Sequence, residues 1–202
     1  MKKRNVAVLI FDEVEVLDFC GPFEVFSVTG KRDNSDPFNV YTVAQHHQLI
    51  LARNALCVKS HFDFNNCPTP DILVVPGGFG TRKEMNNPVL IEWIREVNKK
   101  AELMLSVCTG ALILAKAGLL DGLSATTHHG AVDLLKEVAP KTHVDASKRF
   151  IDNGRVILSA GISAGLDMSL HVVAKLLGKA QAIETAQYME YRWETDKTDH
   201  DF

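Results

Sequence analysis

The stretch L-M-L-S-V-C-T-G-A-L-I-L-A, residues 103–115, is the most informative part of this chain. Its apolar first half predicts a buried strand, and a helical pattern follows with no loop residues in between. Cys108 therefore stands on a tight strand-to-helix turn, with the small residues Ser106 and Gly110 two positions to either side. This pattern is typical of a nucleophile elbow, whose turn holds the nucleophile in a sparsely populated backbone conformation.

The reactive form of a cysteine is its thiolate, and an ordinary thiol is only about 3% ionised at pH 7. The helix that follows Cys108 points its N-terminus at the sulfur, which favours the negative charge. Lowering the thiol pKa by about two units would make thiolate the majority form, for about 2.7 kcal/mol. We therefore expect the helix N-terminus and one hydrogen bond to activate Cys108.

The bulk composition is that of an ordinary globular protein: 202 residues, 46% of them hydrophobic and 23% charged. The net charge of −3 and the lack of a long basic run argue against nucleic acid or an acidic membrane surface as partner. The apolar run Val6–Phe11 is too short for a signal peptide, and no stretch reaches membrane-spanning length. We expect a cytoplasmic protein that forms a single domain over residues 1–202.

Predicted strands alternate with predicted helices along the chain. The strands are expected at 5–11, 38–44, 72–75 and 103–107, with hairpins at 49–59 and 150–158, and the helices at 18–28, 88–99, 109–117, 129–139, 163–177 and 179–192. This alternation predicts an α/β fold, a three-layer sandwich with a mainly parallel, flavodoxin-like sheet. Ligands bind beyond the carboxyl ends of such strands, where the 12–18 loop, the 76–80 turn and Cys108 are expected to converge.

The four cysteines show neither a CxxC pair nor the spacing of a zinc site, so we expect no metal and no cofactor. In a reducing compartment they should be free thiols. Cys20, Cys57 and Cys67 are most simply small buried hydrophobic residues. A hairpin could bring Cys57 and Cys67 together, although nothing in the sequence requires it.

A glycine-rich turn, P-G-G-F-G at 76–80, directly follows a predicted strand. It is interpreted as an oxyanion hole, a phosphate-binding loop or a plain turn. The established phosphate-loop patterns are missing from it. Beside an elbow cysteine the oxyanion hole is favoured, and the backbone N–H groups of Gly78 and Thr109 would form it.

Asp18 has two interpretations. As the residue before a helix it is a candidate N-cap. Its apolar neighbours Leu17 and Phe19 indicate instead a carboxyl group whose pKa is raised by desolvation and which donates a proton near the thiolate.

Three further polar residues are candidates for the site. Thr109 offers its hydroxyl or simply caps the helix. His128 and His129 are candidate bases, and because adjacent residues usually point in different directions, at most one of them is expected to face the site.

With these residues the chain resembles the ThiJ/PfpI branch of the class I glutamine amidotransferase-like superfamily. The resemblance covers nearly the whole length and rests on five segments: 8–22 (V-L-I-F-D-E-V-E-V-L-D-F-C-G-P), 71–80 (D-I-L-V-V-P-G-G-F-G), 106–122, 126–129 (T-T-H-H) and 159–167. It is most similar to isonitrile (isocyanide) hydratases and to the amidotransferase-like domains of AraC-type regulators. The resemblance implies that Cys108, Thr109 and Asp18 are catalytic, that Phe79, Ile162 and one of the tandem histidines line the substrate pocket, and that the protein is a homodimer.

The chain departs from this superfamily's pattern at two points. The protease-like members have histidine directly after the cysteine, where this chain has Thr109, which argues against protease and deglycase activity. Glutamine amidotransferases carry a late His-x-Glu pair, and the corresponding stretch 159–165 has no histidine. The DNA-binding domain of the regulators is also absent from these 202 residues, so a stand-alone domain is expected.

The leading hypothesis is therefore a cysteine-dependent hydratase that converts a small isonitrile into an N-substituted formamide. One alternative is a ligand- or redox-sensing module without turnover, in which Cys108 oxidises reversibly. Another is a different small-amide hydrolase of the same superfamily.

Overall fold

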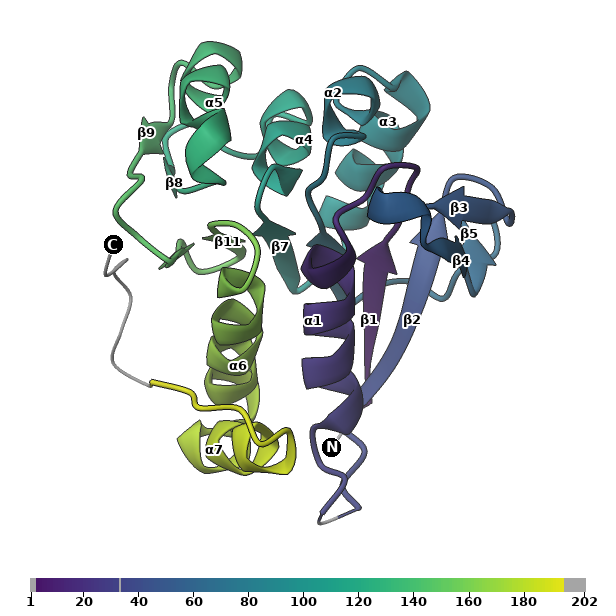
Figure 1. The fold of residues 1–202 in the computed structure, drawn as a ribbon, viewed down its shortest axis with the longest axis vertical. Coiled ribbons are helices and arrows are strands. Elements are labelled where there is room, and N and C mark those ends of the chain that lie inside the picture. The colour runs from purple at the N-terminus through teal and green to yellow at the C-terminus, as the bar shows by residue number, and fades with distance from the viewer. Residues whose placement is uncertain (1–2, 33, 195–202) are drawn as a thin grey trace.

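The computed structural model describes residues 3–32 and 34–194 and has a seven-stranded sheet at its centre (Figure 1). The strands follow the order β10-β11-β7-β6-β1-β2-β5. All neighbours are parallel except β10 and β11, which form an antiparallel hairpin. The predicted α/β fold with a mainly parallel sheet is confirmed.

The sheet strands are β1 (Arg4–Leu9), β2 (Phe38–Ala44), β5 (Phe62–Asp63), β6 (Ile72–Val75), β7 (Leu103–Val107), β10 (Phe150–Asp152) and β11 (Val156–Ser159). The helices are α1 (Val16–Val28), α2 (Thr81–Glu84), α3 (Pro88–Asn98), α4 (Gly110–Lys116), α5 (Val132–Val138), α6 (Ala164–Leu177) and α7 (Lys179–Tyr188). Two small two-stranded sheets pair β3 (Leu49–Leu51) with β4 (Cys57–Lys59), and β8 (Ser124–Ala125) with β9 (His143–Val144). Short 3₁₀ turns cover Arg53–Ala55 and His129–Ala131.

The helices form the outer layers of the sandwich. Helices α1 and α6 stand side by side in front of the sheet (Figure 1). Behind them, α3 packs on α4, which contacts β6 and β7. Every residue of β6 and β7 is buried, as expected for central parallel strands covered on both faces, and this explains why both read as continuous apolar runs.

Helix α3 shows how local signals set the boundaries of an element. The Asn87 side chain caps it by accepting hydrogen bonds from the N–H groups of Val89 and Leu90, and Pro88 occupies the first turn, where it costs no hydrogen bond. Its buried residues recur at helical spacing, at Leu90, Ile91, Ile94 and Val97.

The structure differs from the predicted elements in three places. The predicted helix 129–139 is a 3₁₀ turn followed by α5. The last helix ends at Tyr188 instead of 192, and the chain turns at Glu190, whose φ is 52°. The four-residue helix α2 and the two-residue strands β5, β8 and β9 are too short for a periodic pattern and were not predicted.

The order of the strands decides where the site lies. Strands β7, β6 and β1 are neighbours, so Cys108, the 76–80 turn and the 12–18 loop meet beyond their carboxyl ends. This confirms the expected convergence. Within the described ranges, no helix is both long and apolar enough to cross a membrane.

Candidate active site

Cys108 occupies the turn between β7 and α4, and its φ of 57° lies in the left-handed region. That conformation costs a non-glycine residue about 1–2 kcal/mol. Hydrogen bonds hold it in place: the Cys108 N–H lies 3.1 Å from the carbonyl of Ser159 and 3.2 Å from that of Ala160. The Cys108 carbonyl accepts a 2.8 Å hydrogen bond from the hydroxyl of Thr127. The strained elbow is therefore fixed from two sides, as the sequence predicts for a nucleophile.

Tight packing behind the elbow requires glycine at position 110, two residues after Cys108. A Cβ atom at Gly110 would lie 2.0 Å from the carbonyl oxygen of Val75, at the end of β6. Helix α4 can thus begin directly against the neighbouring strand only because position 110 has no side chain.

Asp18 lies in the first turn of α1 and is fully buried. Its Oδ2 atom accepts a 3.1 Å hydrogen bond from the N–H of Gly77. Its Oδ1 atom has no hydrogen-bond partner among the residues that the structure describes. The N-cap interpretation is wrong: Glu15 is the N-cap, its carboxylate accepting from the N–H of Val16, and the Asp18 carboxyl group turns toward the glycine-rich loop instead.

The Asp18 carboxyl group is hard to ionise. Burial raises its pKa to about 7. Hydrogen bonds from the Cys108 thiol and the Gly77 N–H lower the pKa by smaller amounts. The charge of Glu15 adds to the increase. This agrees with the prediction that desolvation raises the pKa of Asp18.

The Cys108 thiol is also hard to ionise on its own. Burial raises its pKa, and the negative charge of Asp18 raises it further, whereas hydrogen bonding from Thr109 acts in the opposite direction. The expectation that the following helix makes Cys108 a stable thiolate is therefore wrong in direction. Helix α4 has only seven residues, and Cys108 is 5% exposed, so loss of water outweighs the helix dipole.

The two groups titrate as a pair. The Asp18 carboxylate disfavours ionisation of the Cys108 thiol, whereas the hydrogen bond from that thiol favours the carboxylate, so above about pH 7 the pair holds one proton and one negative charge between them. Transfer of that proton from the Cys108 sulfur to the Asp18 oxygen yields a thiolate without any change in the net charge of the buried site. The arrangement therefore supplies a nucleophile and a proton donor together.

Thr109 ties the elbow to the glycine-rich loop. Its hydroxyl accepts a 3.0 Å hydrogen bond from the N–H of Gly78 and lies 3.2 Å from the Gly78 carbonyl, to which it can donate. The hydroxyl of Thr81 lies 3.1 Å from that of Thr109. Thr109 makes no side-chain cap hydrogen bond to α4. The oxyanion hole stays a prediction, because the Gly78 N–H must exchange the Thr109 hydroxyl for a substrate atom to serve in it.

His128 and His129 differ in the cavities that they line. His128 lines the same pocket as Cys108, whereas His129 lines only an adjoining, larger cavity. Their ring centres lie 4.1 Å apart, with the ring planes tilted by 34°. The His128 Nδ1 atom accepts a 3.1 Å hydrogen bond from the N–H of Gly130, and burial, with His129 and Arg82, lowers its pKa. His128 is therefore a neutral imidazole near pH 7 whose proton is on Nε2.

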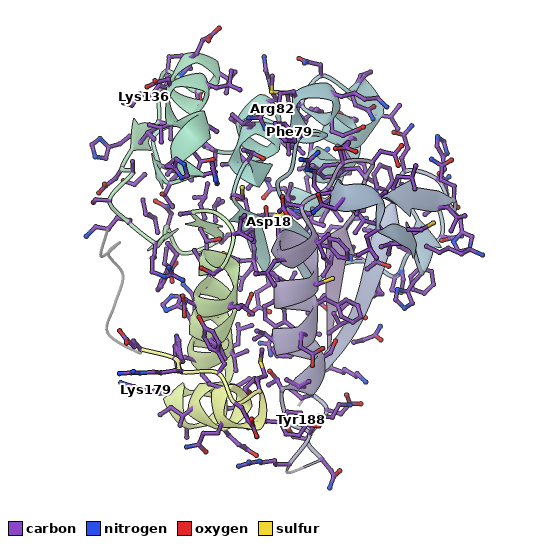
Figure 2. The ribbon with its side chains drawn as sticks, viewed as in Figure 1. Asp18, Phe79, Arg82, Lys136, Lys179 and Tyr188 are labelled. Atoms are coloured by element: carbon purple, nitrogen blue, oxygen red, sulfur yellow. The ribbon has the colours of Figure 1, made fainter. Side chains whose placement is uncertain are left out.

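The pocket that contains Cys108 has a volume of about 270 Å³. Phe79, 61% exposed, lies on its rim with the guanidinium of Arg53 4.3 Å from the ring centre. Ile162 forms part of the wall. Figure 2 shows Phe79 and Arg82 beside each other at α2, beyond the end of α1 that carries Asp18.

Several residues of the site were not predicted from the sequence. They are Glu15 and Arg82 in the pocket wall, Thr81 beside Thr109, and Thr127 beneath the elbow. The only available signal was position, since Thr81 follows the glycine-rich turn and Thr127 precedes the tandem histidines.

The remaining cysteines are free thiols, as expected, and Cys57 and Cys67 are not paired. The interpretation of Cys57 as a buried hydrophobic residue is wrong, because it is exposed on β4, and Cys20 and Cys67 are only half-buried. In residues 3–32 and 34–194, no group of three or more metal-ligating side chains is close enough to hold a metal ion.

Comparisons with known proteins show what this chain is similar to. The chain is 31% identical to the isonitrile hydratase of Pseudomonas putida over 190 residues, 94% of this chain and 78% of that protein. It is 29% identical to the HTH-type transcriptional regulator CdhR of Pseudomonas aeruginosa, of which it spans 52%. The crystal structure of a ThiJ/PfpI family protein from Pseudomonas syringae superposes with a TM-score of 0.84 and 28% identity, over 100% of this chain and 78% of the other.

A more distant likeness extends to the DJ-1 proteins at the level of the fold. Drosophila melanogaster DJ-1beta superposes with a TM-score of 0.82 and 17% identity, over 95% of this chain and all of that one. The profile of the DJ-1/PfpI family matches residues 4–175. This chain therefore belongs to the DJ-1/PfpI family.

Proposed function

We propose that the protein is a cysteine-dependent hydratase that converts an isonitrile, R–N≡C, into the formamide R–NH–CHO. The observation that carries the proposal is the contact between the buried Asp18 carboxyl group and the Cys108 thiol, directly behind a pocket that Cys108 and Thr109 line. The similarity to the isonitrile hydratase of Pseudomonas putida supports the same reaction.

The first step joins sulfur to carbon. The Cys108 thiolate forms a bond to the terminal carbon of the isonitrile while protonated Asp18 gives its proton to the same carbon. The product is a thioimidate, R–N=CH–S–Cys108, and Asp18 is left as the carboxylate.

The second step consumes water. A water molecule adds to the thioimidate carbon, and Asp18 takes one proton from it and passes that proton to the nitrogen. When the resulting adduct collapses, Asp18 accepts the hydroxyl proton, the C–S bond breaks and the thiolate leaves. This releases R–NH–CHO and restores the original pair with its single proton, so one water is consumed in each cycle.

Two neighbours assist. Thr109 positions the glycine-rich loop and directs hydrogen bonding to the sulfur, which favours the thiolate. The Nε2–H of His128 is a donor on the wall of the pocket and can stabilise the developing negative charge.

The test is direct. Purified protein is incubated with an aryl isonitrile, and formation of the N-aryl formamide is followed by chromatography. We expect turnover by the wild-type protein, and a loss on the order of 10³-fold or more in Cys108→Ala. Full activity of Cys108→Ala, or no formamide from the wild-type protein, rejects the proposal.

The same experiment separates the alternatives. Turnover of activated esters or amides without formamide production from isonitriles would identify a small-amide hydrolase instead. Selective oxidation of Cys108 by mild peroxide, without turnover of any substrate, would identify a redox-sensing module. Uniform oxidation of all four cysteines would argue against that module.

We also propose that the protein works in the cytoplasm as a homodimer. Exposed apolar side chains in the segment 49–59 support self-association; they are Leu49, Leu51 and Leu56. Size-exclusion chromatography with light scattering measures the mass of the protein in solution. A monomer at micromolar concentration contradicts the homodimer.

A further inference from the structure

A second cavity adjoins the pocket that contains Cys108. Its volume is about 790 Å³, against about 270 Å³ for the pocket itself. His128 and Ile162 line both, so the two spaces meet at these side chains. Cavities that hold ligands of ordinary metabolite or drug size span roughly 300–1,000 Å³. By this measure the larger cavity, which we call the chamber, accommodates such a ligand and the pocket alone does not.

Gly161 brings the wall of the chamber close to the nucleophile. A Cβ atom at this position would lie 3.2 Å from the Cys108 Sγ and 2.4 Å from Cδ2 of His128. The backbone of Gly161 also lines the chamber. The Gly161 backbone and the His128 ring thus lie close to the sulfur at the edge of the chamber, so a molecule that lies in the chamber can present one end to Cys108.

The walls of the chamber define the chemistry of its occupant. Leu17, Ala146, Ala160 and Ile162 supply apolar surface, and the polar contributions come from hydroxyl and imidazole groups such as those of Ser147 and Ser163. None of the described residues that line it is an aspartate, glutamate, lysine or arginine. A charged group placed there would lose water without gaining an ionic partner, which is strongly unfavourable.

The charged side chains of the site lie in the pocket. Glu15 and Arg82 line the space around Cys108 and do not line the chamber. The isonitrile end of a substrate therefore enters a polar pocket, and the rest of the molecule lies against an uncharged surface.

We infer that the chamber binds the R group of the substrate and selects bulky, uncharged R groups of aromatic size. This inference rests on the proposed hydratase function for its reactive end. It adds the class of substrate: an aryl or similarly bulky isonitrile is preferred over methyl isonitrile and over an isonitrile that carries a carboxylate.

Turnover tests the selectivity. We expect kcat/KM for 2-naphthyl isonitrile to exceed that for methyl isonitrile and for 4-isocyanobenzoate by at least about tenfold. Ala146→Trp fills the chamber from an exposed position and should lower kcat/KM for 2-naphthyl isonitrile at least about tenfold more than it lowers kcat/KM for methyl isonitrile. Ala180→Trp, the same change at an exposed position of α7, is the matched control and should change neither substrate. Equal effects of Ala146→Trp on both substrates overturn the inference.

Binding tests the chamber independently of turnover. Isothermal titration calorimetry with N-(2-naphthyl)formamide is carried out on Cys108→Ala alone and on Cys108→Ala combined with Ala146→Trp or Ala180→Trp. We expect binding to Cys108→Ala and to Cys108→Ala/Ala180→Trp. Binding to Cys108→Ala/Ala146→Trp should be at least about tenfold weaker. If the wild-type protein hydrates no isonitrile but this pattern holds, the proposed reaction fails and the chamber stands. Absence of binding to Cys108→Ala, or binding that Ala146→Trp does not weaken, overturns the chamber even if hydratase activity is found.

Discussion

The backbone N–H of Gly78 donates a 3.0 Å hydrogen bond to the hydroxyl of Thr109, the residue directly after the candidate nucleophile. This contact joins two loops that are 31 residues apart in the chain and that leave neighbouring strands β6 and β7. The position of the elbow and the shape of the glycine-rich loop therefore depend on each other.

Thr109→Val tests this connection. Valine has the shape of threonine but no hydroxyl, so the Gly78 N–H loses its partner, at a cost of about 1–3 kcal/mol. We expect the free energy of unfolding, measured by urea denaturation, to fall by that amount. We also expect kcat/KM for an isonitrile to fall on the order of 10²-fold. Thr109→Ser keeps the hydroxyl and should retain activity within about tenfold. If Thr109→Val is as active as Thr109→Ser, the hydroxyl has no part in the reaction.

The ionisation of the Asp18–Cys108 pair predicts how the thiol reacts with pH. In the wild-type protein, the rate of Cys108 alkylation by iodoacetamide should rise with a midpoint near pH 7, the pH at which the pair loses its first proton, and then level off. In Asp18→Asn the Cys108 thiol keeps its proton and has no carboxylate to pass it to, and burial still disfavours the thiolate, so the midpoint should move above the ordinary thiol pKa of about 8.5. Mass spectrometry of the Cys108 peptide separates this signal from that of exposed Cys57. Identical pH profiles for the two proteins would show that Asp18 does not control the sulfur.

Because Asp18 is buried, its ionisation makes the free energy of unfolding depend on pH. Its pKa is raised from 3.8 to about 7, so protonated Asp18 favours the folded state below about pH 4 and this contribution is lost as the pH rises through about 7. Such a shift corresponds to about 4 kcal/mol. Asp18→Asn carries no charge at any pH. We therefore expect its free energy of unfolding to increase relative to the wild-type protein between pH 4 and pH 8, by an amount of this order.

Denaturant titrations of both proteins at pH 4, 6 and 8 measure that difference. Only the difference between the two proteins is compared, because all other titrating groups are common to both. A difference that does not change with pH would mean that the Asp18 carboxyl group is not buried in the folded protein.

Gly110 is predicted to tolerate no side chain. A Cβ atom there would lie 2.0 Å from the Val75 carbonyl oxygen, so Gly110→Ala must displace α4 or the end of β6 and should cost about 3 kcal/mol or more. Gly118→Ala is the control: its φ is 79° but nothing lies within 4 Å of the added carbon, so only backbone strain of about 1 kcal/mol is expected. Thermal denaturation of the two variants measures the contrast. Equal losses would show that the elbow can relax around alanine.

Much of the architecture could be read from local patterns. The runs 72–75 and 103–107 are strands over the predicted ranges because they are apolar, apart from Ser106, and central in the sheet. The Asn-Gly turn at 153–154 joins β10 and β11 as predicted. The elbow was likewise visible, because a strand followed directly by a helix predicts a tight turn at Cys108, and Cys108 adopts the left-handed conformation there. In these cases the physical cause is local, so the neighbouring residues are enough to predict it.

The chemistry of the site depended on residues that are distant in the chain. Asp18 has the local pattern of a helix cap, and only the approach of the loop from β6 shows its carboxyl group buried against Gly77. The sulfur follows an apolar strand and precedes a helix, which favours ionisation, yet burial and the charge of Asp18 have the larger effect on its pKa. Desolvation and the proximity of a second charge are properties of the assembled molecule, because they depend on what surrounds a group in space. The residue order along this chain thus specified which groups were available and how the backbone turns beneath them, while packing between β1, β6, β7 and α1 decided which of them share a proton.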